Sequence, residues 1–369
     1  MKLVDKLVLR EIFGPFLFGV AAFTSVFFAG SYLLKLTNWI MRGMPLTTAV
    51  EIVTLALPSI VVYTLPMATL LGVLLGVGRL SGDSEVIALF ASGTSLYRLA
   101  LPIIGLGATV SLSAIVLGEL VAPWANTRAE RLRSVALHEV EASALPFTLM
   151  DDATSSLIRV GGGLNPDTGE AKDVTIIRFS DGRPAFIIYA KKAVWGGIDG
   201  PDGRYRWRLI SGFSQSTGDR SPACSTFDES RTRDVKIHKT PQEMAILQKK
   251  PEQMNFRELT ELVAYLKTHP DRGLDQIRKL DVDRWNKFSL PLSSLVFAMV
   301  GAPLGIRKQR SASSVGLGLS ILVIFVYWIV WHYTSSLAVQ GSIEPPIGAF
   351  LADIVGISAA IVLLRKAET

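Results

Sequence analysis

Cysteine and histidine are scarce in this chain of 369 residues, which has one cysteine and four histidines. Because Cys224 stands alone, no disulfide within the chain is possible, and the usual clue to a redox compartment is missing. The histidines are scattered, without a H-E-x-x-H pattern or a Cys/His cluster. We therefore expect no metal site.

Sequence motifs of common enzymes are missing as well. The chain has no G-x-x-x-x-G-K-[ST] segment, the loop that holds nucleotide phosphates in many ATPases. The segment GDSEV around Ser84 lacks the G-x-S-x-G frame of a hydrolase nucleophile. We expect no catalytic residue and no cofactor in this chain, and no enzymatic activity of its own.

Long runs without a charged side chain are the main feature that is present. Residues 52–78 contain none, and at about 1.5 Å per residue a helix of this length crosses a hydrocarbon core of about 30 Å. Similar runs cover residues 12–34, 99–118, 288–306, 311–343 and 345–364, the last interrupted by Asp353. The sequence predicts a polytopic α-helical membrane protein with six transmembrane helices.

A polar insert separates the third predicted span from the fourth. Transmembrane helices 1–3 would then occupy residues 1–123, the insert residues 124–272, and transmembrane helices 4–6 residues 273–369. Runs rich in β-branched and aromatic residues, such as SSLIRVGG and PAFIIYAKKAVW, alternate with turn formers at residues 165–167 and 199–203. This spacing predicts a β-sandwich or β-jellyroll, which would lie outside the membrane.

The last part of the insert has a helical pattern instead. Asn255 precedes an apolar stripe with helical spacing, and Glu258 follows three residues later, which together predict a capping box. A second helical stretch starts at Leu274 and meets no breaker before the fourth span. We expect one continuous helix there.

Basic residues in the short loops predict the orientation. If the N-terminus is cytoplasmic, the short loops of the opposite side hold only Lys35 and Arg42. The cytoplasmic side then receives Lys2, Lys6, Arg10, Arg79, Arg98, Arg307, Lys308, Arg310, Arg365 and Lys366. This bias predicts cytoplasmic termini and an extracytoplasmic insert. The net charge of +6 is therefore not a sign of nucleic-acid binding.

The cytoplasmic loop between the second and third spans, GRLSGDSEVIALFASGTSLYRLALP, predicts a short amphipathic helix over residues 81–93. Asp83 and Glu85 suit the positive end of a helix dipole, Leu89 and Phe90 contribute an apolar surface, and Gly93 suits a helix end. Such a helix either lies on the membrane surface or fits into a groove of a partner ATPase.

This loop resembles the corresponding loop of the LptF/LptG (YjgP/YjgQ) permeases, which extract lipopolysaccharide from the inner membrane. The segment WNKFSLPLSSLVFAMVGAPLGI resembles the fourth span of that family, and the layout of spans around one large domain is similar over the chain. The resemblance implies a location in the bacterial inner membrane, with the large domain a periplasmic β-jellyroll. It favours the ATPase-coupling role of Glu85.

The same resemblance implies several partners. They are an LptB-like cytoplasmic ATPase that holds ATP and Mg, a second permease chain (an LptF/LptG-like paralogue or a second copy), LptC/LptA-like periplasmic jellyroll proteins, and lipopolysaccharide or a related lipid.

Lys35 stands at the outer end of the first span. In the family, a basic residue at this position faces the cavity and meets the phosphates of the lipid, whereas simple snorkelling to the headgroup layer is the alternative. Arg128, Arg131 and Arg133 would extend a ring of positive charge beyond the third span, because guanidinium groups suit phosphate.

His332 and Asp353 are ionisable side chains inside the fifth and sixth spans. A hairpin turning near residues 341–342 would bring them to similar depth, where they either pair or both face water and headgroups. Phe350 and Leu351 precede Asp353, where relatives usually carry an aromatic and then an amide-bearing residue. The sixth span therefore departs from the family pattern.

Together these features predict one permease subunit of an ATP-driven lipid exporter, with a cavity built from spans one, two and five and their equivalents in the partner. A proton-coupled secondary transporter is the first alternative, with Asp353 and His332 as its relay, although we find no internal repeat. A membrane-anchored scaffold with a binding domain is the second, but it leaves the cytoplasmic loop without a role.

Overall fold

The structure is a computed structural model of the chain. It describes residues 3–136, 147–151, 155–165, 168–180, 183–199, 204–216, 224–228, 232–238, 240–241, 244, 249–268, 274–306 and 313–368. Four of the basic residues used to predict the orientation, and parts of two predicted turns, lie outside the described residues. They are Lys2, Arg307, Lys308 and Arg310, and residues 166–167 and 200–203.

Six helices in the described part of the chain are long and apolar enough to cross a membrane, which confirms the predicted spans. They are α1 (Leu3–Met41), α2 (Leu46–Gly82), the run of α4 (Leu96–Val116), η1 (Leu117–Val121) and α5 (Ala122–Ala136), α8 (Leu274–Gly305), α9 (Ser313–Gln340) and α10 (Pro345–Glu368). Helix α8 begins at Leu274 and continues unbroken into the fourth span, as predicted.

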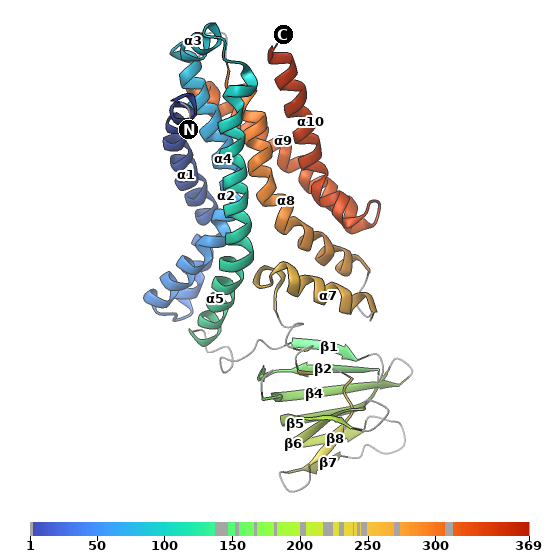
Figure 1. The fold of residues 1–369 in the computed structure, drawn as a ribbon. Helices are drawn as coiled ribbons and strands as arrows, with labels where there is room; N and C mark the ends of the chain where they lie inside the picture. Colours follow the sequence, from blue (N-terminus) through green and yellow to red (C-terminus); the bar gives the residue numbers. More distant parts are fainter. Residues whose placement is uncertain are drawn as a thin grey trace.

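The spans lie side by side in one bundle with two different ends (Figure 1). The β-sheet lies at one end, and α7 (Phe256–Thr268) lies between the sheet and the spans. Helix α3 (Glu85–Ala91) and both ends of the chain lie at the opposite end. We call these the sheet end and the α3 end of the bundle.

Helix α2 packs closely against two neighbours because glycines let the helices approach. A Cβ atom added to Gly76 would lie 2.8 Å from the Cα atom of Ile12 on α1. One added to Gly305 of α8 would lie 2.7 Å from the Cβ atom of Val77. Since apolar burial drives little association within lipid, such close packing is the main attraction between spans.

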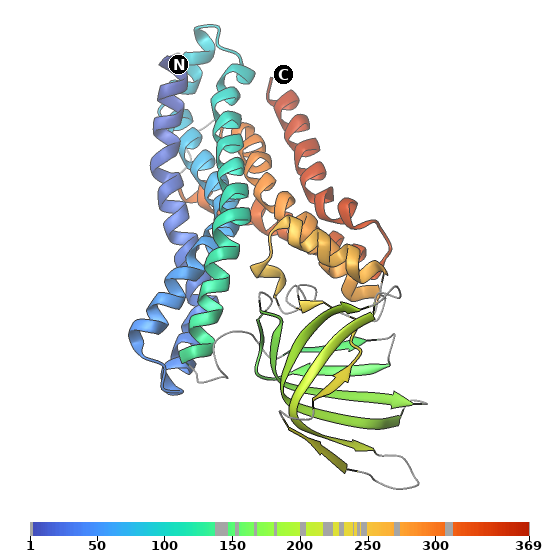
Figure 2. The ribbon, with the colours of Figure 1, turned by 60° about the horizontal axis from the view of Figure 1, so that its bottom comes forward.

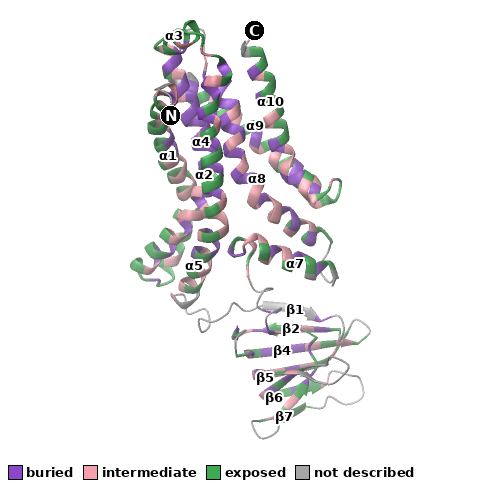
Figure 3. Ribbon diagram, viewed as in Figure 1, coloured by how far each residue is buried: buried purple, intermediate pink, exposed green. Residues whose placement is uncertain are grey.

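Helices α1 and α9, by contrast, leave most of their apolar surface uncovered, as Figure 3 shows for α1. The most apolar window is 17% buried in α1 and 22% buried in α9, against 78% in α2. These surfaces are therefore available to lipid or to another chain.

At the sheet end, the first three spans extend well past their uncharged runs. Helix α1 has 39 residues, about 58 Å at 1.5 Å per residue, against a hydrocarbon core of about 30 Å. At this end of the bundle, α1, α2 and α5 pack on one another through buried Met44 and Ile52, with Trp39 and Leu132 against them. A helix of this length would extend beyond the apolar layer of a membrane.

In the described residues, the predicted β-structure is confirmed as one antiparallel sheet of eight strands. The strands are β1 (Phe147–Asp151), β2 (Ser156–Val160), β3 (Leu164–Asn165), β4 (Glu170–Ser180), β5 (Arg183–Asp199), β6 (Arg204–Ser216), β7 (Cys224–Phe227) and β8 (Arg233–Val235). Their order is β1-β2-β4-β5-β6-β7, while β3 pairs with β4 and β8 with β6.

The sheet curves around an apolar core (Figure 2). Alternating side chains of the central strands fill this core, among them Ile158, Ile176, Leu209 and Trp207, whose ring meets Trp195 edge to face. The jellyroll arrangement expected from the sequence remains a prediction.

The capping box predicted before α7 is present. The N–H of Glu258 donates to Asn255 Oδ1 at 2.8 Å, and the N–H of Asn255 donates to Glu258 Oε2 at 3.0 Å. The predicted apolar stripe of α7 packs with Ile277 of α8. The capping box fixes the start of α7, and the apolar contacts hold α7 against the start of α8.

Candidate functional site

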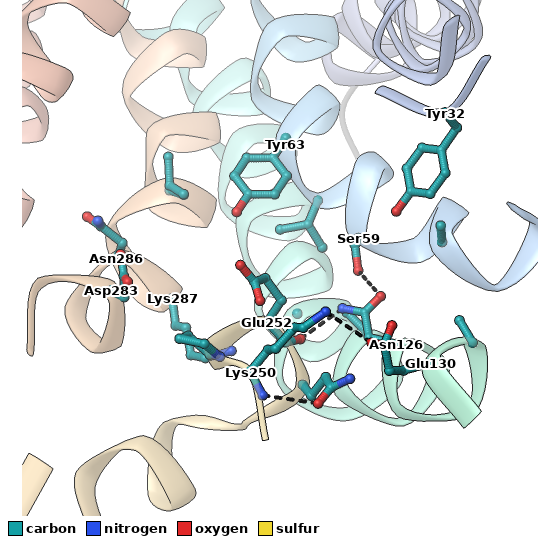
Figure 4. A pocket seen from close by; sticks show the side chains of 18 of the residues that line it. Tyr32, Ser59, Tyr63, Asn126, Glu130, Lys250, Glu252, Asp283, Asn286 and Lys287 are labelled. Atoms are coloured by element: carbon teal, nitrogen blue, oxygen red, sulfur yellow. Dashed lines mark hydrogen bonds and ion pairs between the residues drawn. The ribbon is translucent and has the colours of Figure 1, made fainter. Parts of the chain in front are cut away.

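A cavity of about 750 Å³ lies at the sheet end of the bundle, between the first three spans and α8 (Figure 4). Its walls come from the ends of α1, α2 and α5, from η1, from α8, and from η3 (Pro251–Gln253), which leads from the sheet to α7. Leu259 of α7 and Trp331 of α9 complete the lining. The polar lining residues are Tyr32, Lys35, Ser59, Tyr63, Asn126, Glu130, Arg133, Lys250, Glu252, Gln253, Asp283, Asn286 and Lys287. The other lining residues are apolar or tryptophan, so the cavity suits an amphiphilic molecule.

Glu130 on α5 binds two of the cations that line the cavity. Arg133 donates to both of its carboxylate oxygens, at 3.1 Å from Nε and 2.8 Å from Nη2. Lys250 Nζ lies 3.0 Å from Oε1 of the same carboxylate. An anion that entered the cavity would therefore compete with Glu130 for Arg133 and Lys250.

Asn126 fixes η3 against the spans. Ser59 of α2 donates to Asn126 Oδ1 at 3.0 Å, and Asn126 Nδ2 donates to the carbonyl oxygen of Glu252 at 2.8 Å. These two hydrogen bonds connect α2, α5 and η3 across one corner of the cavity. The segment that returns from the sheet is thereby held as a wall of the site.

Lys35 is the basic lining residue that the described part of the chain leaves without a carboxylate partner. Its ammonium group lies 4.9 Å from the ring centre of Tyr32, in a cation–π contact, and its side chain is exposed. A cation in this position remains available to an anionic group.

Glu119 connects the third span to the two helices that follow the sheet. It lies in η1, a π-helical turn, and its Oε2 accepts a hydrogen bond from the N–H of Phe256 at 2.7 Å. Lys287 Nζ of α8 lies 3.7 Å from Oε1. The carboxylate thus meets the positive N-terminal end of α7 and one cation of α8.

At the opposite end of the bundle, α3 is anchored on one face and open on the other. Val86 is buried with the ends of α1, α2 and α4, whereas Glu85, Ile87 and Phe90 are exposed. In the described residues Glu85 forms no ion pair. The exposed face therefore offers an acid beside apolar side chains, which suits a protein groove.

The ends of α3 show one prediction to be right and one to be wrong. Gly93 adopts φ +86°, and its N–H donates to the carbonyl of Phe90, so it closes the helix as predicted. Asp83 does not open the helix. Asp83 is instead the C-cap of α2, and its Oδ2 lies 3.9 Å from Nε of Arg79. Ser84, the next residue, adopts a left-handed conformation with φ +64°, which separates α2 from α3.

Comparison with known proteins identifies the relatives of this chain. The family described as "Lipopolysaccharide export system permease LptF/LptG" matches residues 6–366. The chain belongs to the LptF/LptG family. Two relatives are the "Lipopolysaccharide export system permease protein LptG" of Escherichia coli strain K12 and that of Escherichia coli O6:H1 strain CFT073. Each is 25% identical over 300 residues, which cover 80% of this chain and 79% of the relative.

In this LptF/LptG member, the four predicted headgroup-binding residues separate into two pairs. Lys35 and Arg133 line the cavity. Arg128 lies outside it, where Nη2 is 3.3 Å from Glu51 Oε1, and Arg131 is exposed without lining the cavity. Of the three arginines expected to extend the ring of positive charge, Arg133 lines the cavity, and headgroup binding at Arg128 and Arg131 stays a prediction.

The side chains that complete this wall were missed in the sequence. Lys250 stands 120 positions after Glu130, and Phe256 stands 137 after Glu119, so neither contact leaves a local pattern. Glu119 itself carried a weak signal, because it ends the uncharged run 99–118. A carboxylate at that boundary marks where the third span meets polar groups.

His332 and Asp353 do not form the arrangement expected for either sequence-based alternative. Asp353 is 1% exposed and is hydrogen-bonded by Tyr327 and Ser289, so it neither faces water nor has His332 as its partner. His332 is exposed on α9, beside the ring of Trp331. A relay through these two residues therefore has no direct contact to use.

Proposed function

We propose that this chain is a permease subunit of an ATP-driven exporter that moves lipopolysaccharide or a related lipid out of the bacterial inner membrane. The observation that carries the proposal is the cavity at the sheet end, with an amphiphilic lining and Lys35 free for an anionic group. In a member of the LptF/LptG family, the matching ligand is a phosphorylated glycolipid.

The uncovered apolar surfaces supply the other half of the lipid site. Helix α1 exposes Val26 and Leu34, and α9 exposes Phe325, Val326 and Ile329. We place the acyl chains against these surfaces, in a larger cavity completed by a second permease chain, either a paralogue or a second copy. The phosphates would then lie at the level of Lys35, where the uncharged run of α1 ends.

The α3 end supplies the contact to the energy source. The exposed face of α3, with Glu85 and Phe90, would seat in an LptB-like ATPase that holds the ATP and Mg. This proposal sets the α3 end in the cytoplasm and the sheet in the periplasm. There the sheet would act as a β-jellyroll that passes lipid to LptC/LptA-like proteins.

Photocrosslinking tests the cavity as the lipid site. A photoreactive amino acid is placed at Lys35, Trp39 or Tyr63, which line the cavity, and at Arg131, which lies near the same end of the bundle outside it. After irradiation in living cells, the purified chain is probed for lipopolysaccharide. We expect adducts at the three cavity positions and none at position 131.

The charge of Lys35 is tested separately. Lys35→Asp should reduce adduct formation from position 63 more than Lys35→Ala, because a carboxylate repels phosphate. Equal labelling in both variants would show that the lysine only reaches toward headgroups. Adducts at position 131 as strong as those in the cavity would show that the cavity is not the lipid site.

A further inference from the structure

Three helices meet at the carboxyl group of Asp353, inside the last span. The residue is 1% exposed. Tyr327 of α9 donates its hydroxyl hydrogen to Oδ1 at 2.9 Å, and Ser289 Oγ of α8 lies 2.7 Å from Oδ2. The carboxyl group therefore binds α10 to both of its neighbours in the second half of the bundle.

The helices packed against Asp353 bring no charge to balance a carboxylate. On α8, the nearest charged side chain in sequence, Lys287, has its own carboxylate partner in η1. On α9, His332 is exposed, and on α4, Arg98 lies 2.6 Å from Asp5. The basic residues of α10 stand in its last turn. Among the described residues, Asp353 has no ion pair, and an ionised carboxylate without one is costly in a span.

The hydrogen bonds around Ser289 require one more hydrogen than an ionised carboxylate provides. Ser289 Oγ lies 2.7 Å from Asp353 Oδ2 and also 2.7 Å from the carbonyl oxygen of Ala349. A serine hydroxyl has one hydrogen, so it satisfies one of these two acceptors. If Asp353 were ionised, the other pair of oxygens would be in repulsive contact without a hydrogen between them.

A proton on Oδ2 removes this conflict. The carboxyl group then donates to Ser289 Oγ, Ser289 donates to the carbonyl oxygen of Ala349, and Tyr327 donates to Oδ1. Each of the three hydroxyl hydrogens then has an acceptor. A carboxyl group in an apolar site is known to stay neutral in this way so that it can donate a hydrogen bond.

We propose that Asp353 stays protonated in the folded chain. As a neutral carboxylic acid, it forms hydrogen bonds to Ser289 and Tyr327 that join α8, α9 and α10. The group is a positioning residue of the bundle and takes no part in a proton relay. This inference does not rest on lipid binding in the cavity.

Carbon-13 NMR of the full-length chain tests the protonation state. The chain is labelled at the side-chain carboxyl carbon of aspartate, placed in phospholipid nanodiscs and titrated from about pH 5 to about pH 8. We expect one resonance at the shift of a protonated carboxyl group throughout, and its loss in Asp353→Asn. Asp275, whose side chain is 82% exposed, is the control, since Asp275→Asn should leave the protonated resonance in place.

Thermal unfolding of the same variants gives a second measurement. Asparagine keeps a donor for Ser289 and an acceptor for Tyr327, so Asp353→Asn should unfold at the wild-type temperature. Asp353→Leu offers neither and should unfold at a lower temperature. The proposal is overturned if no protonated resonance is present in the wild-type chain at neutral pH, which needs no variant to observe, or if the asparagine variant loses as much stability as the leucine variant.

Discussion

Replacing Glu119 with glutamine should leave Lys287 without its ion-pair partner inside the bundle. Lys287 Nζ lies 3.7 Å from Glu119 Oε1, which is too far for a hydrogen bond, so the attraction is mainly coulombic. Both side chains are mostly buried, with exposures of 16% and 18%. At an effective dielectric constant of about 20, the attraction at this distance is about 4.5 kcal/mol, and much of it offsets the cost of taking both charges from water.

Three variants separate these contributions. Glu119→Gln keeps an oxygen for the N–H of Phe256 but removes the ion-pair partner of Lys287. We expect a loss of about 3–4 kcal/mol in the free energy of unfolding. Lys287→Met should lose less, about 2–3 kcal/mol, because Glu119 retains its hydrogen bond to Phe256. The double variant should lose only about 2 kcal/mol, since it leaves neither charge unpaired.

Equilibrium unfolding of the full chain in mixed micelles with increasing dodecyl sulfate measures these losses. Glu261→Gln is the matched control, because Glu261 pairs with Arg257 on the exposed face of α7, and we expect a change within about 0.5 kcal/mol. Additive losses in the double variant, or a Glu119→Gln loss no larger than that of the control, would refute the reasoning.

Three further predictions concern the two ends of the bundle and its packing. Glu85→Arg should abolish copurification of the ATPase, and Glu85→Ala should weaken it. Wild-type association in both variants would show that Glu85 is an exposed acid with no role in ATPase binding. Glu130→Gln should release two cavity cations and strengthen binding of a phosphorylated lipid several-fold in a fluorescence titration, whereas Glu51→Gln, outside the cavity, should not. Gly76→Ala should cost about 1–3 kcal/mol in the unfolding assay because its Cβ would meet α1, but Gly14→Ala, with open space around it, should not destabilise the chain.

The features that could be predicted from the sequence are those with local causes. A span needs a run of uncharged residues of fixed length, and this requirement alone located all six helices. The capping box at Asn255 and Glu258 depends on residues three apart. In both cases the physical cause lies within a single stretch of chain.

The site depended on contacts that no local pattern records. The wall around Glu130 forms because α5 and η3, far apart in sequence, come together. The boundary at Asp83 was wrong for a similar reason. Ser81 is buried at the end of α2, so tertiary packing extends that helix as far as Gly82. This packing outweighs the local preference of Asp83 for the start of a helix.

Helix α2 explains how events at the two ends of the bundle can be linked. Its first half lines the cavity through Ser59 and Tyr63, and α3 follows within three residues of its end at Gly82. The helix continues through Pro58 and Pro66 and is packed through glycines against both α1 and α8. If the proposed ATPase displaces α3, α2 would carry that displacement to the cavity wall, because tightly packed helices shift as bodies. The proposed coupling would then need no separate relay of side chains between ATP hydrolysis and the lipid.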